Sequence, residues 1–328
     1  MPTPRRIAVL DDYQQVAASH ADWDALGAQE VTFFAEHLGA PDDVVAALGP
    51  YDVVVAMRER TAFPAHVLER LPNLGLLVTT GPANVAVDVA AARERGVTVS
   101  GTGGVSPSTP TVEMTWALIL AAARHVPAED RAVREGGWQH TVGRDLSGRR
   151  LGVVGLGGLG RPVATVGLAF GMDVVAWSRH LDPDDARAAG VTPVEKDELV
   201  ATSDVVTIHL KLSERTTGLI GRDELARMKP TALLVNTSRG PIVDEDALVE
   251  ALREGRIGGA ALDVFGTEPL PADSPLRTLP NTVLTPHLGY VTEGTYDVFY
   301  RDAVEDIAAW TDGAPIRELG PDDGGQPA

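Results

Sequence analysis

The sequence predicts an α/β protein made of two doubly wound parallel-sheet domains. Short runs of branched apolar residues alternate with stretches of helix length, which is typical of strands buried on both faces of a parallel sheet. The chain has 328 residues, more than one hydrophobic core usually organises, so two domains are expected. The predicted strands are RIAVL, YDVVVAM, LGLLVTT, RRLGVVG, MDVVAWS, DVVTIHL, TALLVNT, GAALDVF and NTVLTP.

Glycine, serine and proline indicate where the two domains join. The segment 100–110, SGTGGVSPSTP, is too rich in these residues to form a helix or strand. A second break is expected at residues 286–289, between the last apolar strand and the helix TEGTYDVFYRDAVEDIAAW. If the chain crosses between domains at both places, residues 1–101 and 290–328 form the substrate domain. Residues 102–289 then form an inserted dinucleotide-binding domain.

A helix is expected at residues 112–126, VEMTWALILAAARHV, and it is apolar on nearly all sides. Such a helix must be covered on most of its faces. Two coverings are open: a second copy of the chain, or the core of the helix's own domain. We expect the first, which makes the protein a homodimer.

Composition excludes several classes of site and partner. The chain has no cysteine, which removes disulfides, thiolate metal sites and cysteine nucleophiles. Its formal net charge of −18 disfavours nucleic acid and anionic lipid. No apolar run approaches the roughly 20 residues that span a bilayer, and the N-terminus lacks the apolar segment of a secretion signal. We therefore expect a cytoplasmic protein that binds no metal, nucleic acid or membrane.

The stretch LGVVGLGGLG at residues 151–160 predicts a dinucleotide-binding loop. A bare G-x-G-x-x-G means little in a chain with 34 glycines, so its setting decides. Gly155, Gly157 and Gly160 follow an apolar strand and open the segment GRPVATVGLAFG, which leads into the strand MDVVAW. In this setting the glycines let the backbone turn and approach a pyrophosphate. The helix N-terminus adds N–H donors and positive potential.

The residues after the next strand distinguish the two nicotinamide dinucleotides. An Asp or Glu normally binds the ribose hydroxyls of NAD there, but this chain has Ser178 followed by Arg179. Ser178 removes a carboxylate that would repel a 2′-phosphate, and Arg179 offers a planar cation that can bind one. NADP is therefore the preferred cofactor. NAD stays an alternative, because Arg179 can instead lie flat over the adenine.

Polar side chains follow three further strands, at the edge where open parallel sheets bind ligands. Arg239 lies in LLVNTSRG, Asp263 and Glu268 in AALDVFGTEPLP, and His287 in TVLTPHLG. These residue types suit hydride transfer to a 2-oxo acid. His287 can protonate the developing alkoxide, Glu268 can orient the ring and favour its charged form, and Arg239 can bind the carboxylate. Asp263 is expected to bind the carboxamide of the nicotinamide.

These motifs resemble those of the D-isomer-specific 2-hydroxyacid dehydrogenases, a family that includes phosphoglycerate dehydrogenase-like proteins. The resemblance covers nearly the whole chain, from VVVAMRERT through GLGGLG, ARMKPTALLVNTSRGPIVDEDALVEAL and GGAALDVFGTEPLP to TPHLGY. It implies a flavodoxin-like substrate domain and a Rossmann dinucleotide-binding domain. It also implies that the catalytic Arg, Glu and His of the family are Arg239, Glu268 and His287.

The resemblance assigns further residues to the two ligands. Arg58 is expected to face the substrate, with Ala83 and Asn84 of the loop TTGPANVAVD. Relatives commonly have Gly-Val-Gly where this chain has Gly81-Pro82-Ala83, and Pro82 has no N–H to offer a carboxylate. Either one donor is missing, or Pro82 is a turn residue one place outside the carboxylate-binding loop. The residues expected to bind the cofactor are Gly155, Gly157, Gly158, Leu159, Gly160, Ser178, Arg179, His209, Thr237, Asp263 and Gly289.

The expected activity is hydride transfer between NAD(P)H and a 2-oxo acid, giving a D-2-hydroxy acid. Two other functions are open. Some relatives are dinucleotide-sensing corepressors, which keep the same Arg, Glu and His but bind other proteins and turn over little. A formate- or phosphite-type dehydrogenase shares the scaffold and takes hydride from a one-centre anion. Assays with 2-oxo acids and with these anions separate the three functions.

Overall fold

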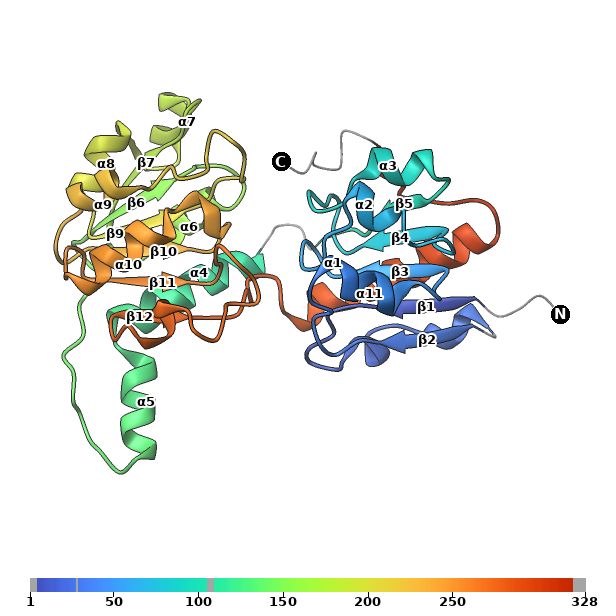
Figure 1. Cartoon of the computed structure of the whole chain (residues 1–328). Coiled ribbons are helices and arrows are strands. Elements are labelled where there is room, and N and C mark those ends of the chain that lie inside the picture. Colours follow the sequence, from blue (N-terminus) through green and yellow to red (C-terminus); the bar gives the residue numbers. More distant parts are fainter. Residues whose placement is uncertain (1–4, 28, 105–108, 321–328) are drawn as a thin grey trace. The chain divides into compact units, whose positions relative to one another are not determined.

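The computed structural model describes residues 5–27, 29–104 and 109–320, and the chain divides into two compact units (Figure 1). Unit 1 comprises Met1–Ser106 and Thr292–Ala328, and unit 2 comprises Pro107–Val291. The first boundary therefore falls after residue 106, where the sequence indicated 101, and the second before residue 292, where it indicated 290. Unit 2 is inserted into unit 1 in the chain.

Unit 1 contains a five-stranded parallel sheet in the order β2-β1-β3-β4-β5. The strands are Arg6–Val9 (β1), Glu30–Phe33 (β2), Val53–Ala56 (β3), Leu76–Thr79 (β4) and Thr98–Gly101 (β5). The helices are Pro41–Leu48 (α1), Ala65–Leu68 (α2), Val89–Glu94 (α3) and Glu293–Thr311 (α11), with 3-10 turns at Ala17–Ser19 and Trp23–Leu26. Because the strands are parallel, the loops that follow β1, β2, β3 and β4 share one edge of the sheet.

Three of the unit 1 strands were predicted, and two were missed. All four residues of β3 and of β4 are buried, which is the pattern that a continuous apolar run predicts. Strand β2 lies at the edge of the sheet and alternates exposed and half-buried residues, so it has no apolar run. Strand β5 ends inside the segment 100–110, which was predicted to be loop, because Ser100 and Gly101 are polar or small.

Unit 2 contains a seven-stranded parallel sheet in the order β12-β11-β10-β9-β6-β7-β8. The strands are Arg150–Val154 (β6), Asp173–Trp177 (β7), Thr192–Pro193 (β8), Val205–Ile208 (β9), Leu233–Asn236 (β10), Gly259–Leu262 (β11) and Thr282–Leu284 (β12). The helices are Thr109–Ala123 (α4), Val126–Arg134 (α5), Gly160–Ala169 (α6), Pro183–Ala188 (α7), Lys196–Thr202 (α8), Arg222–Arg227 (α9) and Glu245–Arg253 (α10). Short 3-10 turns are at Gly240–Ile242 and Pro275–Thr278.

The sheet of unit 2 separates two apolar cores. One joins the strands to helices α8, α9 and α10 through side chains such as Leu199, Leu225 and Leu248. The other joins them to α4 and α6 through side chains such as Ile119 and Val163. A sheet covered by helices on both faces is doubly wound, as the sequence predicted. All six predicted strands of this unit are confirmed, and only the two-residue strand β8 was missed.

The apolar helix expected at residues 112–126 is wrong at its C-terminal end. Helix α4 ends at Ala123, His125 takes a left-handed φ of +54°, and a separate helix α5 begins at Val126. Pro127 explains the break, because its ring cannot follow the carbonyl of Ala123 in a continuous helix. Helix α4 packs against β10, β11, β12 and α6, so the core of its own unit covers most of it. Within the described residues, no helix is long and apolar enough to cross a membrane.

A hydrogen bond between an arginine and a buried carboxyl group joins helix α11 to the segment that follows it. Asp306 is fully buried, and its Oδ1 accepts a hydrogen bond from Nε of Arg317 at 2.9 Å. Burial raises the pKa of Asp306 to about 7, against the opposing effect of the Arg317 charge. The ordinary value for this carboxyl is 3.8. The folded protein therefore holds the proton of Asp306 over a pH range in which the unfolded chain releases it.

We expect Asp306 to lower stability as pH rises. Because its folded pKa lies above the unfolded one, the free energy of unfolding falls between roughly pH 4 and pH 7, by at most about 1.4 kcal/mol per pH unit from this group. Asp306→Asn should remove this dependence, so the variant gains stability relative to wild type between pH 4 and pH 8. Urea unfolding at both pH values measures the difference. Asp312→Asn, at the exposed end of α11, is the control. If the difference in the free energy of unfolding between wild type and Asp306→Asn stays constant with pH, the raised pKa is contradicted.

Candidate active site

The glycine loop between strand β6 and helix α6 is shaped for a dinucleotide phosphate. Gly155 has a φ of +100°, and a Cβ there would meet the carbonyl oxygen of His209 at 2.6 Å. A Cβ on Gly160 would run into the carbonyl oxygen of Gly155. By contrast, a Cβ on Gly157 or Gly158 would have open space around it among the described residues. The outer glycines let the loop fold tightly, and the middle pair leaves the N-terminus of α6 open to a phosphate.

Ser178 and Arg179 follow β7, which is the neighbour of β6 in the sheet. Ser178 is half-buried and Arg179 is exposed. Two of the three acidic residues that follow are engaged in helix α7. Asp182 caps the helix by accepting a hydrogen bond from the N–H of Asp184 at 2.8 Å, and the Asp184 carboxylate pairs with Arg187 at 2.7 Å. The position that usually carries a carboxylate for the ribose of NAD is therefore occupied by Ser178, and the exposed Arg179 follows it.

His209 directly follows strand β9 and lies beside the glycine loop. Its side chain is 8% exposed, and its Nε2 lies 2.9 Å from Oγ1 of Thr207. Burial lowers the pKa of His209 to about 3, so the ring is neutral near pH 7. Its Nδ1 is buried and has no hydrogen-bond partner among the described residues. Buried polar atoms are normally paired, so this nitrogen fits a site that a ligand completes.

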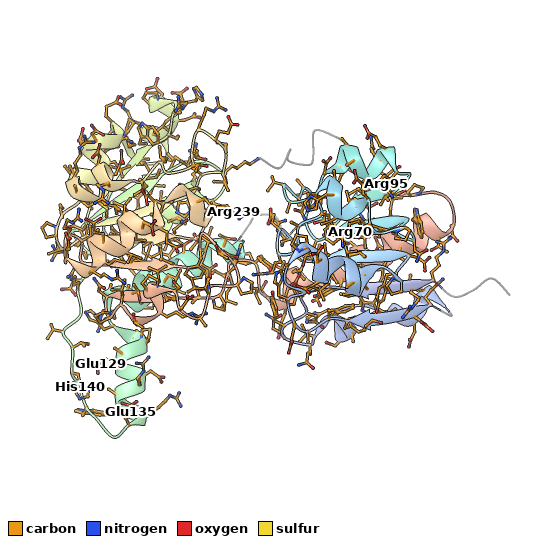
Figure 2. All side chains as sticks on the ribbon, viewed as in Figure 1. Arg70, Arg95, Glu129, Glu135, His140 and Arg239 are labelled. Carbon is orange, nitrogen blue, oxygen red and sulfur yellow. The ribbon has the colours of Figure 1, made fainter. Side chains whose placement is uncertain are left out.

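Thr237 and Arg239 lie in a tight turn at the end of β10. The Asn236 side chain accepts a hydrogen bond from the N–H of Ser238 at 3.0 Å and donates one to the carbonyl of Arg239 at 2.9 Å. Thr237 is 6% exposed, and its hydroxyl lies 2.8 Å from that of Thr115 on helix α4. The turn fixes the backbone of Arg239, whose side chain is labelled in Figure 2.

The Arg239 turn packs against the loop that carries Glu268. A Cβ on Gly240 would run into the backbone of Phe265, so the two loops touch at this point. The N–H of Phe265 in turn donates a hydrogen bond to Oε1 of Glu268 at 3.0 Å. Strands β10, β11 and β12 are consecutive in the sheet. The three loops that follow them therefore meet at one edge.

Glu268 and His287 form a direct pair at this edge. Oε2 of Glu268 lies 2.6 Å from Nδ1 of His287, and the side chains are 22% and 16% exposed. The His287 ring also packs edge-on against Tyr290, with centroids 5.7 Å apart and planes at 72°. With Nδ1 facing the carboxylate, the reactive nitrogen of the ring is Nε2. A carboxylate in this position fixes the tautomer and the orientation of the imidazole.

His287 is held in a strained conformation by a buried carboxylate. Its φ is +56°, a left-handed value that few residues other than glycine adopt. Asp263 is fully buried and accepts three hydrogen bonds from the surrounding loop: from the Thr285 hydroxyl at 2.5 Å, from the Leu288 N–H at 2.8 Å and from the Gly289 N–H at 2.8 Å. These bonds surround His287 on both sides in the chain. Asp263 therefore holds the turn that presents His287.

Two residues that the sequence assigned to the cofactor make hydrogen bonds within the protein. Asp263 was expected to bind the nicotinamide carboxamide, but its carboxylate is fully buried and is used within the His287 loop. Gly289 was expected to contact the cofactor, but its N–H bonds Asp263 and its carbonyl accepts a hydrogen bond from the Thr111 hydroxyl at 3.0 Å. Burial raises the pKa of Asp263 above its usual value, opposed by its hydrogen bond with Thr285. Both residues take part in the hydrogen bonds of the His287 turn, and their contact with the cofactor stays a prediction.

In unit 1, Arg58 and the loop after β4 lie together. The Arg58 N–H donates to the Thr80 hydroxyl at 2.9 Å, and its Nη1 donates to the Thr80 carbonyl at 3.3 Å. Gly81 has a φ of +94°, and a side chain there would run into the Arg58 guanidinium. The Gly81 N–H is taken by the Thr102 hydroxyl at 2.6 Å. Since Pro82 has no N–H, the backbone donor that the loop offers next is that of Ala83.

Asn84, which the sequence assigned to the substrate, makes its side-chain hydrogen bonds within unit 1. Asn84 is fully buried, and its Nδ2 donates to the carbonyl of Arg58 at 2.7 Å and to the Thr79 hydroxyl at 2.8 Å. Its Oδ1 accepts the N–H of Ala86 at 2.9 Å. One amide hydrogen bond ties the loop to Arg58, and the other ties it to Thr79 at the end of β4. Asn84 shapes the loop.

Two features of the site were not visible in the sequence. Thr285 and Leu288 hold Asp263, and no sequence pattern marks them, because a hydroxyl and a backbone N–H become hydrogen-bond donors to a carboxylate only in the folded loop.

The described parts of the chain contain no group of three His, Cys, Asp or Glu side chains that could hold a metal ion.

A comparison with protein families identifies the unit that carries this site. Residues 116–289, more than half of the chain, match the family model described as D-isomer specific 2-hydroxyacid dehydrogenase, NAD binding domain. The chain belongs to this family. A 2-hydroxyacid dehydrogenase transfers a hydride between a nicotinamide dinucleotide and a 2-oxo or 2-hydroxy acid, and this chain is an enzyme of that class.

Curated relatives also support the membership of this chain in the 2-hydroxyacid dehydrogenase family. The glyoxylate reductase of Korarchaeum cryptofilum is 40% identical over 255 residues, which are 76% of each chain. The D-3-phosphoglycerate dehydrogenase of Archaeoglobus fulgidus is 38% identical over 279 residues, 84% of this chain and 52% of that relative. The chain thus spans about half the length of the phosphoglycerate dehydrogenase.

Solved structures extend the likeness to both units of the dehydrogenase. The phosphoglycerate oxidoreductase of Vibrio cholerae has a TM-score of 0.89 at 36% identity, covering 94% of this chain and all of the other. The pyruvate reductase of Chlamydomonas reinhardtii has a TM-score of 0.80 at 29% identity, covering 95% and 98%. The names of these relatives give different substrates, so they do not identify the acid that this enzyme uses.

Proposed function

We propose that this dehydrogenase reduces small 2-oxo acids to D-2-hydroxy acids, with NADPH as the preferred cofactor and with Arg239, Glu268 and His287 as its catalytic residues. The observation that carries the proposal is the 2.6 Å contact between Glu268 Oε2 and His287 Nδ1. A histidine held by a carboxylate, at the sheet edge that carries the glycine loop, is suited to proton transfer beside a bound dinucleotide.

The chain's own residues account for the parts of the reaction that the cofactor does not supply. The bound dinucleotide supplies the hydride, which forms a C–H bond at the keto carbon. His287 Nε2–H gives its proton to the keto oxygen, and Glu268 stabilises the imidazolium while that proton is held. The Arg239 guanidinium binds the keto and carboxylate oxygens in a forked contact. We assign the rest of the carboxylate to Arg58 and to the N–H of Ala83.

For the cofactor, we propose that Gly155, Gly157, Gly158, Leu159 and Gly160 receive the pyrophosphate. Leu159 is the residue before the first turn of α6, where N–H groups have no partner within the helix. His209, whose backbone lies against Gly155 of this loop, and Thr237 are assigned to the same cofactor. Ser178 and Arg179 receive the 2′-phosphate of NADPH.

The activity is tested by following oxidation of NADPH and of NADH with a panel of acids. Glyoxylate, hydroxypyruvate, pyruvate, phenylpyruvate and 3-phosphohydroxypyruvate cover small, apolar and charged side chains. We expect turnover with at least one of them. Tight dinucleotide binding without turnover of any acid would instead identify a sensor. Reduction of NAD(P)⁺ by formate or phosphite would identify a dehydrogenase of one-centre anions.

Replacing Arg179 should separate the two cofactors. Arg179→Ala is expected to raise KM for NADPH roughly 10- to 100-fold and KM for NADH much less, because a charge-assisted contact to a phosphate contributes about 1.5 to 3 kcal/mol. Ser178→Asp should shift preference toward NADH by repelling the phosphate. Steady-state KM values for both cofactors measure the effect, with Arg187→Ala on helix α7 as the control. Equal losses for NADPH and NADH would support stacking of Arg179 on adenine.

We also propose that the enzyme is a homodimer, and we place the contact on helix α5 and the segment after it. This arm extends away from the rest of unit 2 (Figure 1) and carries exposed apolar side chains: Val126, Val133, Trp138 and Val142 are 52%, 53%, 75% and 91% exposed. Glu129 fixes the arm by accepting the N–H groups of His140 and Thr141 at 3.1 and 2.6 Å (Figure 2). A fixed apolar arm is suited to another protein surface.

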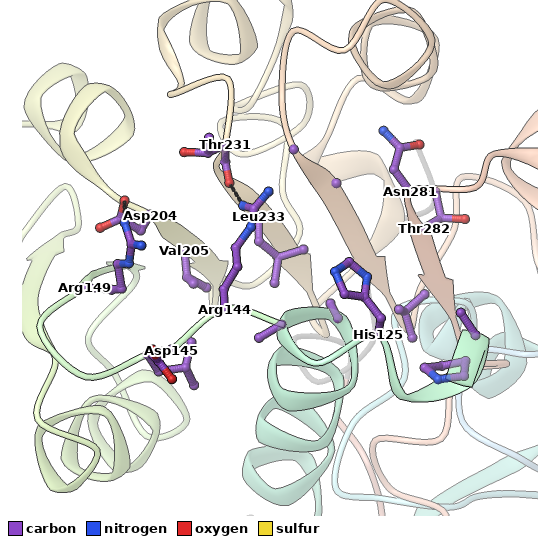
Figure 3. A pocket seen from close by; sticks show the side chains of 18 of the residues that line it. His125, Arg144, Asp145, Arg149, Asp204, Val205, Thr231, Leu233, Asn281 and Thr282 are labelled. Atoms are coloured by element: carbon purple, nitrogen blue, oxygen red, sulfur yellow. Dashed lines mark hydrogen bonds and ion pairs between the residues drawn. The ribbon is translucent and has the colours of Figure 1, made fainter. Parts of the chain in front are cut away.

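A groove at the base of the arm offers a surface for the second copy. Its volume is 340 Å³, and it runs along the amino ends of β9 to β12 between His125, Arg144 and Asn281 (Figure 3). Light scattering tests the arm: Trp138→Ser combined with Val142→Ser should shift the enzyme toward monomer. Val85→Ser is the control, because it removes an apolar side chain of unit 1 that is 55% exposed. This variant should not shift the enzyme toward monomer. An unchanged mass for the arm variant would place the dimer contact elsewhere.

A further inference from the structure

A second pair of a histidine and a carboxylate lies at the carboxyl edge of the unit 1 sheet. Nδ1 of His37, in the loop after β2, lies 3.2 Å from Oδ1 of Asp11, in the loop after β1. Asp11 is 2% exposed, and it also accepts hydrogen bonds from the hydroxyls of Tyr13 at 3.1 Å and Thr61 at 2.8 Å. Thr61 belongs to the loop after β3. One buried carboxylate therefore joins three neighbouring loops at this edge.

These loops contain an unusual concentration of strained backbone. Asp11, Gln15 and Arg58 have φ values of +57°, +56° and +50°. They are three of the seven non-glycine residues with positive φ in the described chain, and a fourth is His287. Each such residue costs free energy, and such positions concentrate at functional sites. Contacts that only hold three loops together do not require this many residues with positive φ at one edge of the sheet.

The pair orients the partly exposed His37 ring and favours its charged form. The hydrogen bond with Asp11 raises the pKa of His37, against the lowering effects of its burial and of the nearby Arg60 charge. The His37 side chain is 22% exposed, and with Nδ1 facing Asp11 its second N–H is on the opposite side of the ring. The guanidinium of Arg60 lies over the Tyr13 ring, 5.7 Å from its centroid. His37 and Arg60 thus bring two cationic donors to one place.

The order of strands puts the pair of His37 and Asp11 at the same sheet edge as the residues assigned to the substrate carboxylate. In the sheet order β2-β1-β3-β4, Arg58 follows β3 and Ala83 follows β4, while Asp11 and His37 follow β1 and β2. We propose that His37, oriented by Asp11, is a specificity-determining residue that binds an anionic oxygen at the end of a 2-oxo acid remote from its keto group. The inference rests on the proposed function, because it takes the carboxylate to lie at Arg58 and Ala83.

The proposal names a substrate class. A second carboxylate or a phosphate accepts a hydrogen bond from the charged imidazole, and a terminal methyl or phenyl group does not. Charge-assisted hydrogen bonds are about twice as strong as neutral ones. The enzyme therefore prefers 2-oxo acids with a second anionic group over pyruvate and phenylpyruvate.

The test compares kcat/KM for 3-phosphohydroxypyruvate, 2-oxoglutarate, hydroxypyruvate and pyruvate. His37→Gln is expected to lower kcat/KM for one of the two dianionic acids about 10-fold more than for pyruvate, through KM. The acid that responds shows whether phosphate or carboxylate is the group bound. His66→Gln, an exposed histidine on α2, is the matched control and should leave the ratios unchanged. Equal changes for all four acids would overturn the assignment of His37.

The pH dependence of the same ratio provides a second measurement. Because His37 donates only when protonated, the preference of the wild type for the dianion should fall as pH rises through the raised pKa of this ring. Asp11 and Arg60 are the charged groups that face it, and Asp11→Asn should move the fall to lower pH. If no acid is turned over, the proposed function fails. Calorimetric binding of 2-oxoglutarate and pyruvate to wild type and His37→Gln then still tests His37, since equal affinities would refute it.

Discussion

His287→Gln is expected to lower kcat for 2-oxo acid reduction by roughly 100-fold or more, while the affinity for the dinucleotide stays near that of the wild type. Glutamine retains a hydrogen-bonding side chain but cannot carry the proton that the keto oxygen needs. Glu268 would remain beside it, 2.6 Å from where Nδ1 now lies. Because the loss is in the transition state, kcat and kcat/KM should fall together.

Steady-state kinetics and fluorescence titration of the dinucleotide measure the two quantities separately. Glu268→Gln should give a smaller loss, because the amide can still orient the ring but cannot balance its charge. His66→Gln serves again as the control, since it removes an exposed histidine from the other unit. A His287→Gln enzyme that retains most of its turnover would refute the role of this residue as proton donor.

Asp263→Ala is expected to lower kcat by about tenfold or more, although Asp263 is fully buried. The change leaves two backbone N–H groups and the Thr285 hydroxyl without their acceptor, at a cost of about 1 to 3 kcal/mol for a buried donor. The turn around His287, with its φ of +56°, then loses the bonds that hold it. His287 should sample orientations in which its proton is not aligned with the substrate.

The same variant separates positioning from cofactor binding. If Asp263 acts through His287, KM for NADPH changes little and kcat carries the loss. If it binds the carboxamide of the nicotinamide, KM for NADPH rises instead. Thr285→Val removes one of the three hydrogen bonds and keeps the carboxylate, so it should show the kcat effect in milder form. Thermal unfolding of both variants checks that unit 2 remains folded, and a normal kcat in folded Asp263→Ala would reject the positioning role.

The sequence by itself determined the parts of this protein that depend on local pattern. All nine strands predicted from apolar runs are present, because a strand buried on both faces needs branched apolar residues at every position. The glycine loop was predicted from Gly155, Gly157 and Gly160 because its geometry is local to one βαβ unit. The strands β2, β5 and β8 were missed, since each lies at the edge of its sheet and lacks a continuous apolar run.

Only the tertiary structure decided which hydrogen bonds the residues around the site make within the protein. Asp263 was assigned to a ligand because it follows a strand at the correct edge, and Asn84 and Gly289 were assigned by the family resemblance. Yet their hydrogen bonds are satisfied by groups as far as 178 residues away in the chain, as between Gly289 and Thr111. The pairing of His37 with Asp11 spans 26 residues and leaves no sequence signal. A hydrogen bond depends on distance and direction between two atoms, and for residues on different loops only the folded sheet sets these.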